Sequence, residues 1–215
     1  MINYAHRGAS AYAPENTMSA FDLGLRMNAD GIETDIRRTK DGVLVLFHDD
    51  DLLRIAGIPG SVEELTYEEL SAIDLGLRKG PQYRGERIVT LDDFLSRFSV
   101  PGVMLALEIK GKGIASDVWN RVRNIRSGYT ITSFDYGSLL EVRKLSDSPR
   151  LGYLTDDFSH SMIDRIVSDG LTEICPRADL LTSGMSDYAH DKGLSVRAWG
   201  VADYGLMVHC CLNGA

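Results

Sequence analysis

Short apolar runs alternate with amphipathic segments along the whole chain. Residues 2–5 are predicted to form a short strand, and residues 14–27 a helix in which Met18, Phe21 and Leu25 recur at helical spacing. The same strand-then-helix order continues to the end of the chain. Further strands are predicted at 31–36, 103–109, 129–132, 151–154, 173–175 and 195–199, and further helices at 61–74, 91–98, 115–125, 138–145, 160–168, 183–192 and 204–211.

This alternation predicts an α/β fold with a parallel sheet. Seven strand–helix units in one chain favour a TIM (β/α)8 barrel over an open doubly wound sheet. Residues 50–89 interrupt the rhythm with Gly, Pro and charged residues, and are predicted to be a small insertion after the second strand of a single domain, residues 1–215.

Composition narrows the class of protein. Hydrophobic residues make up 44% of the chain and charged residues 25%, which is ordinary globular usage, and no window has the roughly 18 apolar residues of a membrane span. The N-terminus lacks the pattern of a secretory signal, and three cysteines form neither a disulfide framework nor a zinc spacing, so a reduced cytoplasmic location is expected. A net charge of −8 argues against nucleic acid and anionic membranes as partners, but permits an anionic small molecule where a metal reverses the local field.

The stretch GIETDIRRTKDGVLVLFHDD, residues 31–50, gathers unusual polar groups around a turn signal. Asp41–Gly42 predicts a two-residue hairpin turn, which places Asp35 opposite His48. Glu33 lies two residues before Asp35 and therefore shares its face of the strand. The predicted register thus collects Glu33, Asp35 and His48 in one patch, and a β-bulge shifts this register by one residue.

Two interpretations of this patch remain open from the hairpin alone: an exposed polar face of a ribbon, or half of an active site. The apolar run VLVLF, residues 43–47, indicates that the ribbon is at least partly buried. Two carboxylates that point into one site repel each other unless a cation binds them or one keeps a proton. Mg²⁺ and Ca²⁺ take oxygen ligands of this kind, which favours an active site.

Two other predicted strands end in polar residues. After the first strand, His6 is followed by Arg7, whose guanidinium suits a phosphate group, and by Gly8, which lets the backbone approach a ligand closely. Glu108 and Lys110 stand two residues apart at the end of another strand. They form either a simple buried ion pair or a third carboxylate ligand beside a cation for a substrate oxyanion.

Segments of the chain resemble the glycerophosphodiester phosphodiesterase family over nearly its whole length. These are AHRGASAYAPENTMSAF, GIETDIRRTKDGVLVLFHDDDL, LEIK, SF and AW, in the family's order and spacing. The resemblance implies a TIM barrel with a small insertion after the second strand, which agrees with the fold predicted above. It also implies a general acid–base pair, His6 and His48; ligands of Mg²⁺ or Ca²⁺ at Glu33, Asp35 and Glu108; phosphate contacts from Arg7 and Lys110; and support from Glu15 and Asn16.

The implied activity is cleavage of a small-molecule glycerophosphodiester into sn-glycerol 3-phosphate and an alcohol such as choline or ethanolamine. One histidine takes a proton from the nucleophile while the other protonates the leaving alkoxide, and the sequence leaves open which does which. The nucleophile is either water or a glycerol hydroxyl that gives a cyclic phosphate first.

The chain departs from the family after Trp199, where Gly200 and Ala202 replace the usual threonine and asparagine, and this changes the expected pocket for the leaving group. Family members also continue past the equivalent of Gly214–Ala215 into an eighth strand. Because a parallel barrel with seven strands leaves two unpaired edges, the last strand is expected to be missing from a truncated or incompletely represented C-terminus. Trp199 itself is expected to line the substrate pocket or to pack as ordinary core. A phospholipase-like lipid phosphodiesterase is an alternative, but no amphipathic membrane helix stands out. A non-catalytic phosphate-binding barrel is another, although binding alone does not need both histidines.

Overall fold

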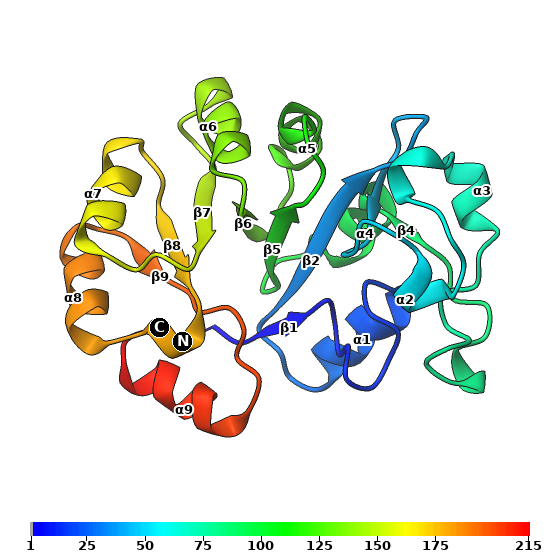
Figure 1. The fold of residues 1–215 in the computed structure, drawn as a ribbon, viewed down its shortest axis with the longest axis horizontal. Coiled ribbons are helices and arrows are strands. Elements are labelled where there is room, and N and C mark those ends of the chain that lie inside the picture. Colours follow the sequence, from blue (N-terminus) through cyan, green and yellow to red (C-terminus); the bar gives the residue numbers. More distant parts are fainter. Residues whose placement is uncertain (1) are drawn as a thin grey trace. The chain divides into compact units, whose positions relative to one another are not determined.

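A computed structural model describes residues 2–215 (Figure 1). The chain divides into two compact units, residues 2–129 and residues 130–215, here called the N-terminal and the C-terminal unit. The organisation of the whole chain as one domain stays a prediction.

The N-terminal unit is built on parallel strands that hold polar residues in register. Strand β1 (Tyr4–His6) pairs with β2 (Gly31–Arg38), and β2 pairs on its other side with β5 (Met104–Ile109). Alternation along β2 and β5 separates fully buried aliphatic residues from the carboxylates. The aliphatic set comprises Ile32, Ile36, Leu105 and Leu107.

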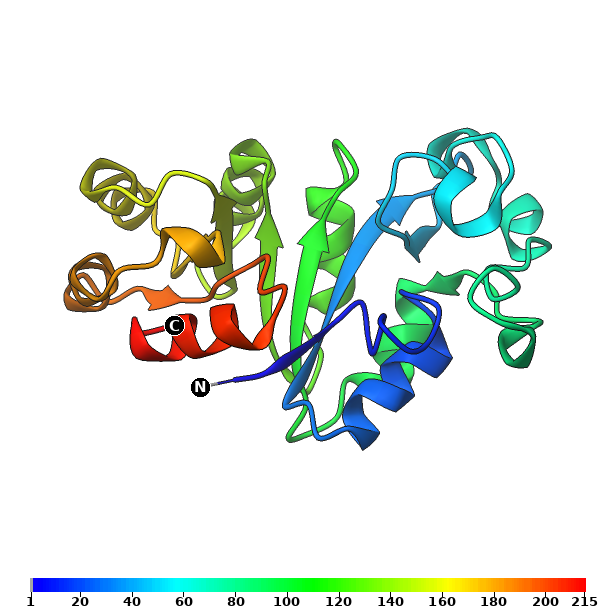
Figure 2. The same cartoon turned by 60° about the horizontal axis from the view of Figure 1, so that its bottom comes forward.

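Helices pack against these strands through aromatic side chains. Helix α1 (Met18–Arg26) and helix α4 (Leu91–Phe98) begin after Thr17 and Thr90, whose hydroxyls accept backbone N–H bonds from the first turn. Helix α1 lies beside α4 (Figure 2). The buried rings of Phe21, Phe94 and Phe98 join the two helices, with centroids 4.8–5.6 Å apart. Helix α5 (Ala115–Val122) follows β5.

We expect Phe94→Ala to lower the free energy of unfolding by about 3–5 kcal/mol, because a fully buried aromatic ring leaves a cavity behind. Chemical denaturation monitored by circular dichroism measures the loss. Phe134→Ala is the matched control, since 43% of that side chain is already exposed. Equal losses for the two variants would contradict the assignment of Phe94 to the core.

The hairpin after β2 was predicted with the wrong register. Strand β3 (Leu44–Leu46) pairs antiparallel with β2 so that Ile36 lies opposite Leu46. The turn has three residues between Thr39 and Val43, with Gly42 at φ 90°, because the Thr39 hydroxyl accepts the Val43 N–H and shifts the pairing by one residue. Phe47 therefore lies opposite Asp35, and His48 follows the strand instead of pairing within it.

The predicted insertion packs with strand β3 around one small core. Strand β4 (Val89–Thr90) closes it by pairing with β3. The helix predicted over 61–74 is broken into a 3₁₀ turn (Val62–Glu64) and helix α3 (Tyr67–Ser71), which begins with a capping box at Thr66. Helix α2 (Leu53–Ala56) and a 3₁₀ turn (Pro81–Tyr83) complete the segment. Its core comprises Val45, Phe47, Leu52, Val62, Leu70, Leu75 and Ile88.

The C-terminal unit continues the strand–helix alternation (Figure 1). Its strands pair in parallel in chain order, and its helices begin within a few residues of the predicted positions. The strand predicted over 195–199 is shorter, because only Ser195 and Val196 form regular ladder pairs, followed by an isolated bridge between Trp199 and Arg177. The elements are β6 (Gly128–Ser133), α6 (Tyr136–Leu145), β7 (Arg150–Thr155), α7 (His160–Ser168), β8 (Glu173–Pro176), a 3₁₀ turn (Ala178–Leu180), α8 (Ser183–Asp191), β9 (Ser195–Val196) and α9 (Tyr204–Leu212).

Candidate active site

Three carboxylates converge in the N-terminal unit. Glu33 and Asp35 lie on one face of β2, and Asp35 stands in register with Glu108 of β5. Their possible ligand atoms all lie within 4.8 Å of one another, and the three residues are at most 7% exposed. Alternation along one strand and register between two parallel strands therefore bring together the three residues predicted as metal ligands.

The electrostatics of this cluster fit a divalent cation. Burial, together with the charge of Asp35, raises the pKa of Glu108 to about 7, and Lys110 offsets this only in part although its Nζ lies 2.9 Å from Glu108 Oε1. Asp35 Oδ1 is buried, accepts no hydrogen bond from residues 2–215, and lies 3.9 Å from Lys110 Nζ. Because a hard cation takes oxygen ligands and neutralises such a cluster, the residues present fit Mg²⁺ or Ca²⁺.

The loop after β1 places Arg7 beside the carboxylates. Arg7 adopts a left-handed conformation, φ 56°, and its N–H donates to the Glu33 carbonyl at 2.9 Å. Its Nε lies 3.3 Å from Asp35 Oδ2. Gly8 follows at φ 77°, and a Cβ there would lie 2.4 Å from the backbone of Ala20, so only glycine permits this close turn onto α1.

The two predicted supporting residues both contact the site. Asn16, in the left-handed region at φ 55°, donates from Nδ2 to Asp35 Oδ2 at 2.9 Å, and its Oδ1 accepts from the Thr34 hydroxyl. Asn16 thus fixes one oxygen of Asp35 and leaves Oδ1 for a cation. Glu15 Oε1 accepts from Arg7 Nη1 at 3.0 Å. The predicted helix over 14–27 begins only at Met18, because this irregular loop holds Asn16 outside helical geometry.

The charge of His48 contributes to lowering the pKa of His6, so the two predicted acid–base histidines lie within electrostatic range of each other. His6, at the end of β1, has its Nε2 3.7 Å from Glu33 Oε2. Burial among protein atoms and the charge of Arg7 lower the pKa of His6 to about 4, although 65% of the side chain remains exposed. His48 lies just past β3, where strand alternation no longer sets its direction, and its Nδ1 lies 2.6 Å from Asp49 Oδ1.

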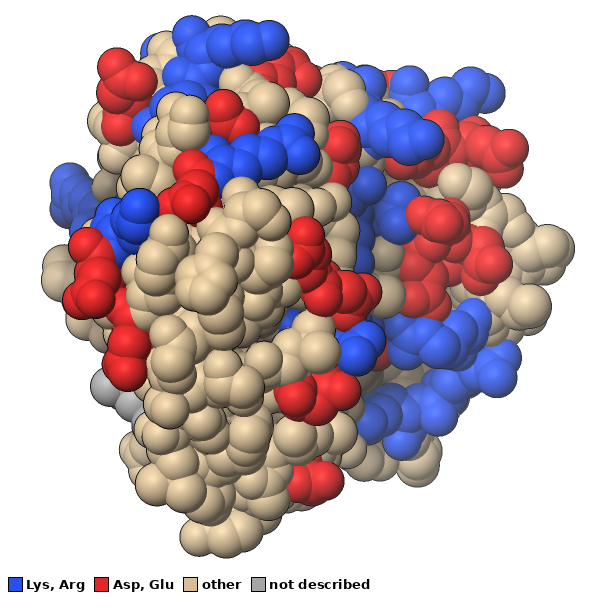
Figure 3. All heavy atoms as spheres, turned by 60° about the vertical axis from the view of Figure 1, so that its left-hand side comes forward, with Lys and Arg blue, Asp and Glu red and all other residues tan. Residues whose placement is uncertain are grey.

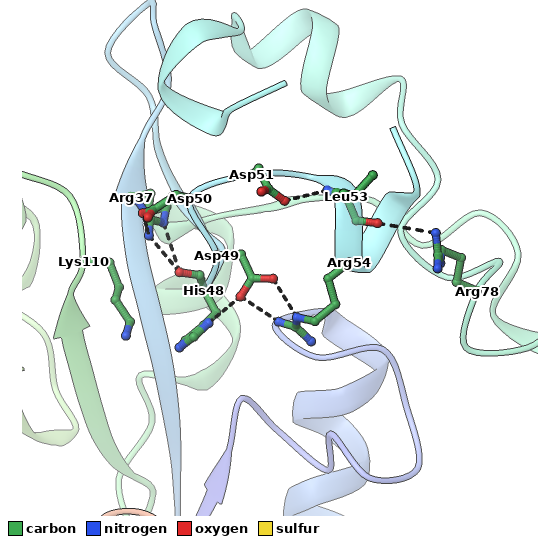
Figure 4. Close-up of a pocket in the computed structure, with 9 residues that line it drawn as sticks. All are labelled: Arg37, His48, Asp49, Asp50, Asp51, Leu53, Arg54, Arg78 and Lys110. Carbon is green, nitrogen blue, oxygen red and sulfur yellow. Dashed lines mark hydrogen bonds and ion pairs between the residues drawn. The ribbon is translucent and has the colours of Figure 1, made fainter. Parts of the chain in front are cut away.

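His48 and Lys110 line one open pocket of about 860 Å³, shown in Figure 4. None of the other seven lining residues was predicted as part of the site, and three of them contact His48 or its partner Asp49: Arg37, Asp49 and Arg54. Arg37 is nearly buried and donates from Nε and Nη2 to the His48 carbonyl at 3.2 and 2.9 Å, which anchors the backbone of the histidine. The position of Asp49 directly after His48 is a sequence signal that could have indicated it as a partner of the imidazole ring.

Trp199 belongs to the C-terminal unit. Its indole N–H donates to the Thr155 carbonyl at 3.3 Å, and its ring packs edge-on against Phe134 with centroids 5.0 Å apart. These contacts fix the orientation of the ring. Its role in binding substrate stays a prediction.

Comparison with known proteins identifies the family to which this chain belongs. A model of the glycerophosphoryl diester phosphodiesterase family matches residues 6–214, and the chain belongs to this family. YhdW of Bacillus subtilis (strain 168) is 40% identical over 154 residues, which are 69% of this chain and 63% of that protein. A glycerophosphodiester phosphodiesterase of Caldanaerobacter subterraneus subsp. tengcongensis is 35% identical over 157 residues, 70% of this chain and 65% of that protein. This chain therefore spans just under two thirds of the length of these relatives.

Solved structures confirm the predicted fold class, an α/β fold of the TIM-barrel type. A phosphodiesterase from Oleispira antarctica, in complex with the product sn-glycerol-3-phosphate, has a TM-score of 0.91 at 24% identity and covers 100% of this chain and 90% of its own. A glycerophosphodiester phosphodiesterase from Thermotoga maritima has a TM-score of 0.80 at 25% identity and covers 98% and 91%.

The length of the helices and the charge of the surface concern two of the predictions, that the protein has no membrane anchor and no nucleic-acid partner. Among residues 2–215, no helix is both long and apolar enough to cross a membrane. On the face drawn in Figure 3, acidic side chains lie among the basic ones. Mixed charge of this kind is unlike the basic surface that nucleic acids require, and the absence of a nucleic-acid partner stays a prediction.

Proposed function

We propose that this protein hydrolyses glycerophosphodiesters to sn-glycerol 3-phosphate and an alcohol, with a divalent cation and two histidines. The observation that carries the proposal is the buried cluster of Glu33, Asp35 and Glu108, directly beside the cationic side chains of Arg7 and Lys110. Family membership supports the same reaction class. The Oleispira antarctica phosphodiesterase, which shares the fold and holds sn-glycerol-3-phosphate, supports the same substrate class.

Each charged residue has a distinct task in this proposal. Glu33, Asp35 and Glu108 would hold Mg²⁺ or Ca²⁺, which supplies positive charge to the phosphoryl oxygens when bound. Arg7 and Lys110 bind the same phosphate and stabilise the charge that develops on it during cleavage. The acidic protein thus presents local positive charge to an anionic substrate.

The histidines transfer protons in this proposal. Hydrolysis by water breaks the bond between phosphorus and the leaving oxygen, so one proton leaves the attacking water and one reaches the departing alkoxide. His6 and His48 supply the acid and the base. A glycerol hydroxyl as first nucleophile uses the same two groups and gives a cyclic phosphate that water then opens.

A substrate panel tests the proposal. Glycerophosphocholine, glycerophosphoethanolamine and lysophosphatidylcholine are incubated with Mg²⁺, with Ca²⁺ or with chelator. The released choline or ethanolamine is measured together with sn-glycerol 3-phosphate, or with the acylated glycerol 3-phosphate that lysophosphatidylcholine yields. We expect release from the first two substrates only with metal. Release from none of them, with binding of glycerophosphocholine retained, would identify a non-catalytic phosphate-binding barrel, and turnover of lysophosphatidylcholine alone a lipid phosphodiesterase.

Three finer expectations belong to the same proposal. The panel distinguishes Mg²⁺ from Ca²⁺. Trp199→Ala tests whether this ring contacts the substrate, through a rise in KM with kcat unchanged. The cytoplasmic location expected from the composition is tested by fractionation of cells that express the protein.

A further inference from the structure

Helix α2 of the insertion carries an arginine that binds two carboxylates at once. The Arg54 guanidinium donates from Nη1 and Nη2 to the two oxygens of Glu15, both at 2.7 Å. It also donates from Nε and Nη2 to the two oxygens of Asp49, at 2.6 and 2.9 Å. Glu15 lies 39 residues before Arg54, so this side chain ties the insertion to the loop before α1.

The contact between Asp49 and His48 determines which ring nitrogen of the neutral imidazole carries the proton. Asp49 Oδ1 lies 2.6 Å from His48 Nδ1, and Figure 4 shows Asp49 between the histidine and Arg54. A carboxylate only accepts hydrogen bonds, so the proton of the neutral ring sits on Nδ1 and Nε2 is left for proton exchange. The hydrogen bond from Arg54, opposed by burial and helped by His48, lowers the pKa of Asp49 to about 2. Asp49 is therefore a charged acceptor at any pH near neutrality.

The Glu15 end sets the direction of Arg7. Glu15 Oε1 accepts from both Arg54 Nη2 and Arg7 Nη1, and the Glu15 side chain is only 15% exposed. Burial alone would raise the pKa of Glu15, but the hydrogen bonds from Arg54 and the charge of Arg7 outweigh it and the pKa is lowered. Arg7 in turn lies 3.3 Å from Asp35, so a continuous chain of polar contacts joins His48 to the carboxylate cluster.

We propose that Arg54 is a positioning residue that orients His48 through Asp49 and Arg7 through Glu15. This role rests on the proposed function, because Arg54 is taken to orient two residues of the proposed active site. The planar guanidinium donates a pair of hydrogen bonds to each of two carboxylates in fixed directions. A lysine ammonium is a point charge and cannot make both pairs of hydrogen bonds.

If Arg54 only stabilised the fold, its substitution would change the free energy of unfolding slightly and leave the kinetics unchanged. Arg54 is 49% exposed, and ion pairs at the surface contribute little to stability. Arg97 offers a matched comparison, because it makes a similar two-bond contact with Asp22 and is 56% exposed, away from the carboxylate cluster. Arg54→Lys and Arg97→Lys thus remove the same kind of fork, and only the first lies next to the proposed site.

The kinetic experiment separates the effect of the Arg54–Asp49 contact from that of the Arg54–Glu15 contact. We expect Arg54→Lys to lower kcat and raise KM, each by about 10–100-fold, as loss of an orienting partner typically does. Asp49→Asn reproduces mainly the fall in kcat and Glu15→Gln mainly the rise in KM. The double variant Arg54→Lys, Asp49→Asn has the kcat of Asp49→Asn alone, because both changes act through His48. Arg97→Lys keeps native kinetics. Native kinetics for a folded Arg54→Lys, or strictly multiplicative losses in the double variant, would overturn the proposal.

A spectroscopic experiment tests the proposal without turnover. Nitrogen NMR of protein labelled at histidine, at a pH where the ring is neutral, is expected to show His48 protonated on Nδ1 in the native protein and in Arg97→Lys. In Arg54→Lys the proton is shared between Nδ1 and Nε2. An unchanged Nδ1 proton in Arg54→Lys overturns the proposal. If the native protein cleaves no diester while this shift is seen, the proposed function fails and the positioning of His48 by Arg54 stands.

Discussion

His48→Ala is expected to lower kcat by roughly 10²–10⁴-fold, the range that a positioned general acid or base contributes. The expected size follows from the surroundings of the ring. Its backbone is held by Arg37 and its Nδ1 by Asp49, so Nε2 is presented in a fixed direction. His6→Ala is expected to cause a loss of the same order, because the departing alkoxide and the nucleophile need two proton carriers. Steady-state release of sn-glycerol 3-phosphate from glycerophosphocholine measures both losses.

His190→Ala is the control for these variants, since His190 is an exposed histidine on helix α8. It should retain native kcat, and all three variants should show native circular dichroism. The prediction fails if His48→Ala and His6→Ala cleave glycerophosphocholine as His190→Ala does. In that event the acid and base must be sought among other groups that line the pocket.

Local rules of strand geometry were enough to predict that two of the three carboxylates share one face of a strand. Glu33 and Asp35 are two residues apart on one strand, so alternation alone puts them on one face. Glu108 and Asp35 lie at the ends of neighbouring parallel strands, and register brings them together. The first inference uses only backbone periodicity, which the sequence displays directly, whereas the second needs the pairing of β2 with β5, which only the structure gives.

The rest of the site depends on side chains that form turns and bridges. The Thr39 hydroxyl changed the hairpin from a two-residue to a three-residue turn, so the predicted facing of Asp35 and His48 was wrong even though both residues belong to the same region. Arg54 was missed because its two partners lie 5 and 39 residues away, and no spacing rule links them. Contacts of this kind require the folded loops to be known.

Addition of Mg²⁺ or Ca²⁺ to chelated protein is expected to raise the melting temperature. Saturation at a free metal concentration 100-fold above Kd contributes about 2.7 kcal/mol, which for a chain of this size corresponds to about 5–10 °C. The physical source is the buried cluster, where Asp35 Oδ1 accepts no hydrogen bond from residues 2–215 and Glu108 has its pKa raised to about 7. A carboxyl whose pKa in the folded state exceeds its ordinary value of 4.5 opposes folding as pH rises above that value, and a bound cation removes this opposition.

The variant Glu108→Gln tests whether the rise in melting temperature comes from metal bound at the carboxylate cluster or from metal bound unspecifically. Because glutamine cannot ionise, we expect the chelated variant to melt at a higher temperature than chelated native protein at pH 8, and to lose most of the rise caused by metal. Glu141→Gln, an exposed carboxylate on helix α6, should retain the full metal-induced rise. Differential scanning fluorimetry with and without chelator measures all three proteins. A metal-induced rise in Glu108→Gln equal to that of the native protein would place the cation elsewhere, since the proposed site consists of the possible ligand atoms of Glu33, Asp35 and Glu108, which all lie within 4.8 Å of one another.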